Sequence, residues 1–140
     1  MKISESLVKD LQKKLVLIAY TLMFAHAGIG KLVAGKTPDW FLRQFEASIL
    51  NVFSGSLSIQ FFGIGLAESL IAVLALLGLF QKSLQDQILK VVLLSSSGLF
   101  IVLSFGQRIS YKFDDAASLF FYAIASIALL SLFKESNESA

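Results

Sequence analysis

Three ionisable side chains lie in apolar stretches of this sequence, and they are its first candidates for chemistry. His26 and Lys31 fall near the end of an apolar run that begins at Leu15, and Glu68 falls inside a second such run. A buried carboxylate is costly unless it is neutralised, hydrogen-bonded or paired with a cation. It can carry a proton, hold a polar ligand or tie two helices together, and the sequence leaves these roles open for Glu68.

The composition indicates that lipid surrounds these residues. Of the 140 residues, 56% are hydrophobic and 16% are charged, whereas a soluble domain has about 25% charged residues. Charges are nearly absent from four windows, each close to the roughly 20 residues that cross a hydrocarbon core: residues 15–34, 57–80, 88–106 and 116–133. A soluble bundle would show polar stripes on its helices, and Leu70–Phe80 has no charge on any face. We predict an all-α integral membrane four-helix bundle, in a single domain over residues 1–140.

The connection between the first two windows is too aromatic for a solvated loop. Its apolar residues recur mostly at intervals of four, as Trp40, Phe41, Phe45, Ile49 and Phe53. This stripe predicts a short helix near residues 38–53 that lies in the membrane interface and covers the bundle as a lid. An aromatic belt that only anchors the chain is the alternative to a functional lid.

Helix geometry places polar groups from all four windows at one depth. At about 1.5 Å per residue, His26, Glu68, Ser96 and Ser126 lie roughly 12–16 Å below the outer ends of their windows. We therefore predict a polar mid-membrane pocket, ligand-binding or proton-linked, formed by these four residues, with His26 as the partner of Glu68. Side chains that only hydrogen-bond one helix to another are the structural alternative.

Lys31 is predicted to act apart from that pocket. It lies five residues after His26, which is about 140° around a helix, so the two side chains cannot share a face. Lys31 is also close to the outer surface, where it can extend to the interface and pair with Asp39 or Glu46 of the lid. We therefore group it with the aromatic lid residues.

Other chemistries lack the residues that they need. The chain has no cysteine and one histidine. It can therefore form no disulfide or thiolate site, and it cannot supply both histidine ligands of a bis-histidine haem. The sequence has no metal-ligand cluster, no phosphate-binding glycine loop and no self-contained catalytic site. Its net charge of +2 is too small to predict nucleic-acid binding. The chain is therefore at most an accessory membrane subunit of an enzyme.

Three short motifs resemble the DoxX-like family of small four-helix membrane proteins, including its MauE relatives. They are "GIGKL" at the end of the first window, "TPDWFLRQF" in the aromatic connection and "GLAESL" in the second window. The resemblance covers residues 20–80 and places Gly28, Lys31 and Glu68 on the family's G-x-x-K and membrane-glutamate positions. It implies association with quinone-linked sulfur or amine oxidation, or with the maturation of redox partners.

Three functions fit these observations. The first is a redox-associated subunit that binds a quinone or lipid-like ligand and presents it to a redox partner protein. The second is a non-catalytic structural or assembly subunit of a membrane complex. The third is a small proton-coupled carrier, which has few spans for that task unless it forms a homo-oligomer.

The distribution of Lys and Arg predicts the orientation. Seven of them fall on the side of the termini and five on the other side, which favours a multi-pass protein of the inner membrane with both termini in the cytoplasm.

Overall fold

Five helices make up the part of the chain that the structure describes. The structure is a computed structural model that describes residues 4–138, so residues 1–3 and 139–140 of the predicted domain lie outside it. No strand occurs among the described residues. The helices are α1 (Glu5–Leu32), α2 (Asp39–Phe45), α3 (Ser56–Phe80), α4 (Gln85–Ile109) and α5 (Phe113–Glu138).

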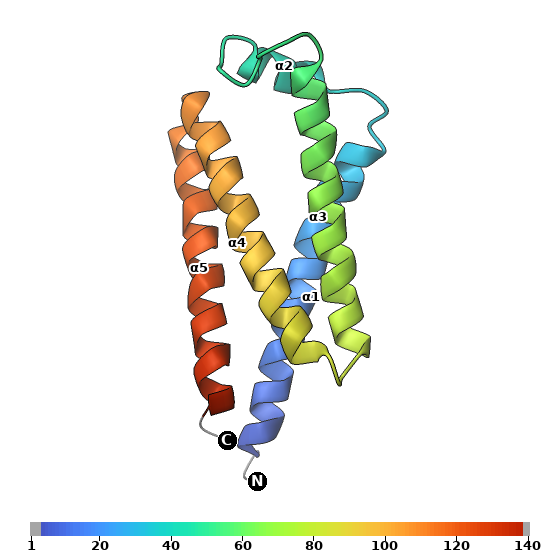
Figure 1. The fold of residues 1–140 in the computed structure, drawn as a ribbon, viewed down its shortest axis with the longest axis vertical. Helices are drawn as coiled ribbons and strands as arrows, with labels where there is room; N and C mark the ends of the chain where they lie inside the picture. Colours follow the sequence, from blue (N-terminus) through green and yellow to red (C-terminus); the bar gives the residue numbers. More distant parts are fainter. Residues whose placement is uncertain (1–3, 139–140) are drawn as a thin grey trace.

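The four long helices run up and down, and the short α2 lies across one end (Figure 1). α1 packs along α3, α4 packs along α5, and contacts between α3 and α4 join the two pairs. The beginning of α1 and the end of α5 lie together at the end opposite α2 (Figure 1). The predicted all-α membrane four-helix bundle is confirmed.

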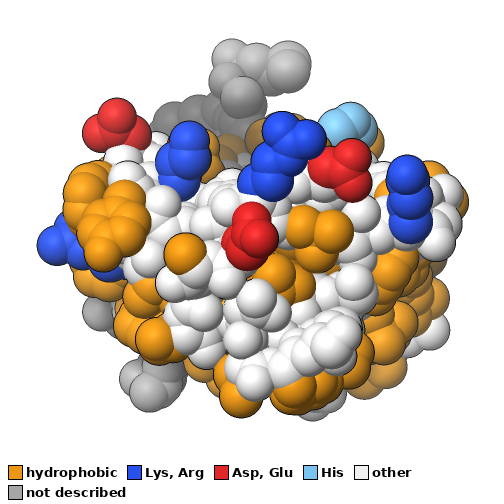
Figure 2. All heavy atoms as spheres, turned by 90° about the horizontal axis from the view of Figure 1, so that it is seen from above, with side chains coloured by type: hydrophobic (Ala, Val, Ile, Leu, Met, Phe, Trp, Pro, Cys, Tyr) orange, Lys and Arg blue, Asp and Glu red, His pale blue; other side chains and the backbone are white. Residues whose placement is uncertain are grey.

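The outside of the bundle is apolar along all four long helices. Each is long and apolar enough to cross a membrane, and even the most buried apolar windows have only 33% of their residues inside the protein. Leu22, Leu66, Leu94 and Phe121, one from each long helix, are more than half exposed. The end that carries α2 instead mixes charged and hydrophobic side chains (Figure 2). So large an apolar surface is unsuited to water, and the chain is a multi-pass membrane protein that contacts lipid.

The first helix begins ahead of the predicted membrane window. α1 starts at Glu5, whereas the predicted window starts at residue 15, because the amphipathic segment ahead of the window continues the same helix. In this segment Lys14 pairs with Asp10 one turn away, at 2.8 Å, and Lys13 pairs with Asp86 at the start of α4, at 2.7 Å. Charged contacts thus support the part of α1 that hydropathy alone excludes.

The lid helix is shorter than predicted. α2 ends at Phe45, and the predicted helix near residues 38–53 is wrong beyond that point. The hydroxyl of Ser48 donates to the backbone carbonyl oxygen of Phe45, and the side-chain amide of Asn51 donates to the backbone carbonyl oxygen of Glu46. Such side-chain bonds to the backbone compete with helical bonds, so turns replace the expected helix up to α3.

Glycines let α1 and α3 approach closely. A Cβ atom on Gly28 would lie 2.6 Å from the backbone nitrogen of Ser69 and 2.8 Å from the carbonyl oxygen of Gly65. A Cβ atom on Gly65 would lie 2.7 Å from the Cβ atom of Lys31. Membrane helices use small residues in this way to bring their backbones together. The two helices therefore meet where no larger side chain fits.

Adding one methyl group at Gly28 is expected to destabilise the bundle. In Gly28→Ala the new Cβ atom would collide with backbone atoms of α3, which cannot move aside as the end of a side chain can. We expect the free energy of unfolding in detergent micelles to fall by about 2 kcal/mol. Gly30→Ala is the matched control, because nothing lies within 4 Å of a Cβ atom at Gly30. Equal losses for the two variants would contradict the close helix contact.

Candidate functional site

An ion pair between Lys31 and Glu68 joins α1 to α3. Lys31 Nζ donates to Glu68 Oε2 at 2.7 Å, to Oε1 at 3.0 Å and to the carbonyl oxygen of Ala27 at 3.4 Å. Glu68 is 4% exposed, and the Lys31 side chain is 23% exposed. Each charge would be costly alone among apolar helices and lipid. The pair neutralises both, and it brings together two residues that the sequence analysis assigned to different sites.

The direction of helical side chains explains why this pair forms. Side chains lean toward the N-terminus of their own helix, and α1 and α3 run in opposite directions (Figure 1). Lys31 therefore leans back along α1 toward Ala27, and Glu68 leans along α3 toward Lys31. Because Gly28 and Gly65 keep the helices close at this point, the two charged ends meet directly.

The prediction that His26 faces Glu68 is wrong. His26 is exposed on the outside of α1. The buried residues of α1 recur three or four apart, as Leu17, Tyr20, Phe24 and Gly28. Lys31 extends this stripe by three residues, whereas His26 lies about 200° from Gly28 around the helix. The prediction that Lys31 pairs with Asp39 or Glu46 is also wrong, because Lys31 lies on the face of α1 that packs against α3 and pairs there with Glu68. Asp39 and Glu46 are both exposed.

The two predicted serines are buried, but they serve other contacts. Ser96 and Ser126 are both 0% exposed. Ser96 donates to the carbonyl oxygen of Val92 in its own helix, at 2.6 Å. Ser126 donates to the carbonyl oxygen of Tyr122 and lies 2.6 Å from the hydroxyl of Tyr20. Because the Ser126 proton is already used, the Tyr20 hydroxyl is the donor, and this bond links α1 to α5.

Two of the aromatic lid residues are buried against the bundle, and the third is exposed. Phe41 and Phe45 are 8% and 4% exposed, whereas Trp40 is 60% exposed. Phe41 packs on Phe61 of α3 with ring centroids 5.1 Å apart, and Leu57 completes this small apolar cluster. α2 is therefore held down on α3 by two rings and presents its tryptophan outward.

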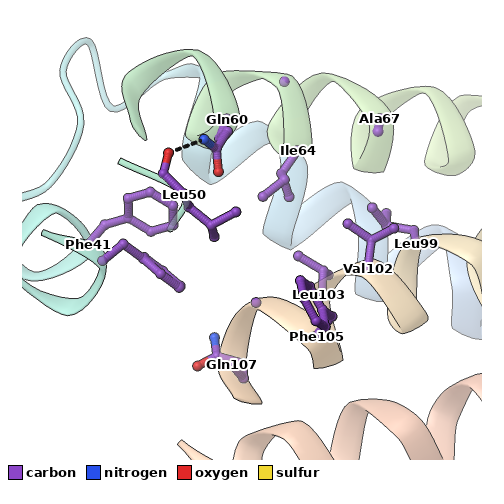
Figure 3. A pocket seen from close by; sticks show the side chains of 13 residues that line it. Phe41, Leu50, Gln60, Ile64, Ala67, Leu99, Val102, Leu103, Phe105 and Gln107 are labelled. Atoms are coloured by element: carbon purple, nitrogen blue, oxygen red, sulfur yellow. Dashed lines mark hydrogen bonds between the residues drawn. The ribbon is translucent and has the colours of Figure 1, made fainter. Parts of the chain in front are cut away.

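A pocket of about 360 Å³ lies beneath α2, between α3 and α4 (Figure 3). Small-molecule sites occupy about 300–1,000 Å³, so this pocket is large enough for a ring with short substituents. Its walls are mainly apolar, and they include Phe41, Phe45, Leu50, Ile64, Leu103 and Phe105. Gln60 and Gln107 add the polar atoms. Space for a ligand therefore exists just under the lid.

This pocket is not the predicted polar one. None of His26, Glu68, Ser96 and Ser126 lines it, although Ala67, the neighbour of Glu68, does. Glu68 faces α1 from one side of α3, while Gln60, Ile64 and Ala67 face the pocket from an adjacent side. The equal depth of the four predicted residues does not bring them into one site.

Comparison with known proteins adds no relative. No family model, no curated protein and no solved structure matches this chain. The functional argument therefore depends on the geometry of the chain itself.

Three polar residues of these contacts escaped the sequence analysis. Tyr20 belongs to the buried stripe of α1, and its spacing of eight from Gly28 was the available signal. Gln60 lies two turns before Glu68 in the same apolar window, and Gln107 comes directly after the third window. Neutral amides near the ends of spans are common enough that nothing in the sequence distinguishes these two.

Breaking the Lys31–Glu68 pair on one side is expected to cost more than removing both partners. Lys31→Met leaves the carboxylate without a cation, and Glu68→Gln leaves the ammonium without an anion. Each is expected to lower the free energy of unfolding by about 3 kcal/mol, the usual cost of leaving a buried charge without its partner. The double variant has neither charge, so most of the loss should be recovered.

The control for these variants is Lys13→Met. It breaks the pair with Asp86, whose side chain is 46% exposed, and should cost no more than about 1 kcal/mol. Unfolding by SDS titration in mixed micelles measures all four proteins. A double variant that loses the sum of the two single effects would show that Lys31 and Glu68 act independently.

Proposed function

We propose that this chain is a DoxX-like accessory membrane protein that binds a quinone or lipid-like ligand in the pocket beneath α2. The observation that carries this proposal is the pocket itself, about 360 Å³ of space between apolar and aromatic walls. Ligand sites are mostly apolar, with a few placed polar groups that orient the ligand. The ligand would lie near the lid, away from the ion pair of Lys31 and Glu68.

Electrons would have to come from a redox partner protein. With no cysteine and one histidine in the chain, its side chains offer no thiol redox chemistry and no pair of haem ligands. The chain would hold the ligand and present it, while oxidation or reduction takes place on the partner. The excess of Lys and Arg on the side of the termini favours an inner-membrane protein with both termini in the cytoplasm.

A structural or assembly subunit is the second candidate. Among the side chains that the structure describes, those of residues 4–133, no fully buried nitrogen or oxygen atom lacks a hydrogen-bond partner. This favours polar groups that only tie helices together, with a homo-oligomer or a larger complex covering the apolar outside. The proton-coupled carrier has less support, because Glu68 is paired with Lys31 and does not line the pocket.

Filling the pocket is expected to abolish ligand binding without harming the fold. Gly63 lines the pocket, and nothing lies within 4 Å of a Cβ atom built on it. In Gly63→Leu the side chain would therefore start in open space and extend into the volume that a ligand needs. We expect the dissociation constant for a decyl-substituted benzoquinone to rise at least about tenfold, equivalent to roughly 1.4 kcal/mol.

Trp40 provides the measurement. It is the single tryptophan, and its ring lies 5.7 Å from that of Phe41 in the pocket wall, so a bound quinone should quench its fluorescence. Gly98→Leu is the matched control, since Gly98 also has open space around it and does not line the pocket. Saturable quenching that is lost only in Gly63→Leu supports the proposal. Absence of saturable quenching in the unmodified protein would contradict ligand binding and favour the structural or assembly subunit.

A further inference from the structure

One acceptor atom in the pocket wall is left without a donor. The amide nitrogen of Gln60 donates to the carbonyl oxygen of Leu50 at 2.9 Å, which fixes the orientation of the side chain. Its Oε1 atom has no hydrogen-bond partner among the side chains described, those of residues 4–133, and the fully buried side-chain nitrogen and oxygen atoms in that range all have one. Oε1 is therefore accessible, and Figure 3 shows it on the side of Gln60 that faces the space between Leu50 and Ile64.

One donor group in the same wall is also left over. The hydroxyl of Ser110 donates to the backbone carbonyl of Gln107 at 3.0 Å, so it accepts from Gln44 Nε2, also at 3.0 Å. Gln44 Nε2 donates as well to Gln107 Oε1 at 2.7 Å. This chain of bonds fixes both amides and leaves Gln107 Nε2 free among the described residues. The pocket thus offers one unused acceptor and one unused donor.

We propose that the ligand of this pocket carries a ring hydroxyl, as a hydroquinone does, and that Gln60 selects it over the corresponding quinone. This inference rests on the proposed function, because it specifies the ligand of the same pocket. A hydroxyl donates to Gln60 Oε1, and a ring oxygen accepts from Gln107 Nε2. A quinone oxygen only accepts, so it leaves Gln60 Oε1 unpaired in an apolar place.

The walls favour a ring over an aliphatic alcohol. Phe41 and Phe45 lie with their ring centroids 4.8 Å apart, and Phe105 comes from α4 on the other side. Aromatic rings pack well against one another at such distances. The selection is by binding alone, with no bond made or broken on this chain. It would hold the reduced form of a ring ligand until a partner oxidises it.

The test compares three ligands with the same decyl chain. Hydroquinone binding is measured by competition, as recovery of the Trp40 fluorescence that the bound quinone quenches, under anaerobic conditions. We expect the hydroquinone to bind about tenfold more tightly than the quinone, because an unpaired buried acceptor costs about as much as a hydrogen bond contributes. The dimethyl ether of the hydroquinone, which accepts but cannot donate, should bind no better than the quinone.

Variants separate this selection from a structural effect. Gln60→Met removes the acceptor and should bring the ratio of the two dissociation constants close to one. Loss of the bond to Leu50 would by contrast weaken both ligands equally. Gln107→Met should weaken both forms, since both have a ring oxygen that accepts. Gln87→Met, at an exposed position near the start of α4 and outside the pocket, should leave both constants unchanged.

The outcomes distinguish the two proposals. Saturable binding of both forms with equal affinity would overturn the selection by Gln60 and leave the proposed function standing. No saturable binding of either form would overturn both. Competition by decanol as strong as that by the hydroquinone would overturn the assignment of a ring ligand.

Discussion

The contact between Lys31 and Glu68 is the interaction on which the arrangement of α1 and α3 depends. Two opposite charges that lie 2.7 Å apart among apolar helices bind strongly, and either one alone would oppose insertion into lipid. The glycines at the crossing make the short distance possible, since a Cβ atom on Gly28 or Gly65 would collide with the other helix. Charge and close packing therefore act at the same crossing, because the glycines bring the helices near enough for the two charged ends to meet.

This constraint also determines where space for a ligand can exist. α3 is held against α1 along one face, and its other contacts are with α4 and, through Phe61, with α2. α4 is in turn held along α5. The pairs α1–α3 and α4–α5 are thus the most closely packed pairs of helices, and beneath α2 the region between α3 and α4 is not filled by side chains. The pocket follows from tight packing within each pair.

The sequence predicted those features that depend on composition along a helix. Four spans follow from hydropathy, and the inward position of Glu68 agrees with Gly65, Ala72 and Ala75, which lie three, four and seven positions away on its face and let another helix approach. Depth was less informative, because it describes the position along the membrane normal and not the direction around the helix. For this reason the sequence analysis placed His26 inward and Lys31 outward, which is the reverse of the structure. The inward face of α1 could have been recognised from the spacing of its buried residues, Leu17, Tyr20, Phe24 and Gly28. The pocket depends on contacts between distant segments, and no local pattern predicts it.

Separation of the charged contact from the pocket has a physical advantage. A ligand that bound at Glu68 would have to compete with the ammonium of Lys31, and the bundle would lose this ion pair between α1 and α3 each time the ligand entered. Gln60 and Gln107 are neutral, so leaving one of their atoms unpaired costs far less than leaving a charge unpaired. With the ligand proposed above, the amides would be exposed in an empty pocket and paired in an occupied one, and the ion pair of Lys31 and Glu68 would be unchanged in both. The link between α1 and α3 then does not have to break for a ligand to enter the pocket, because Lys31 and Glu68 pair with each other and neither lines it.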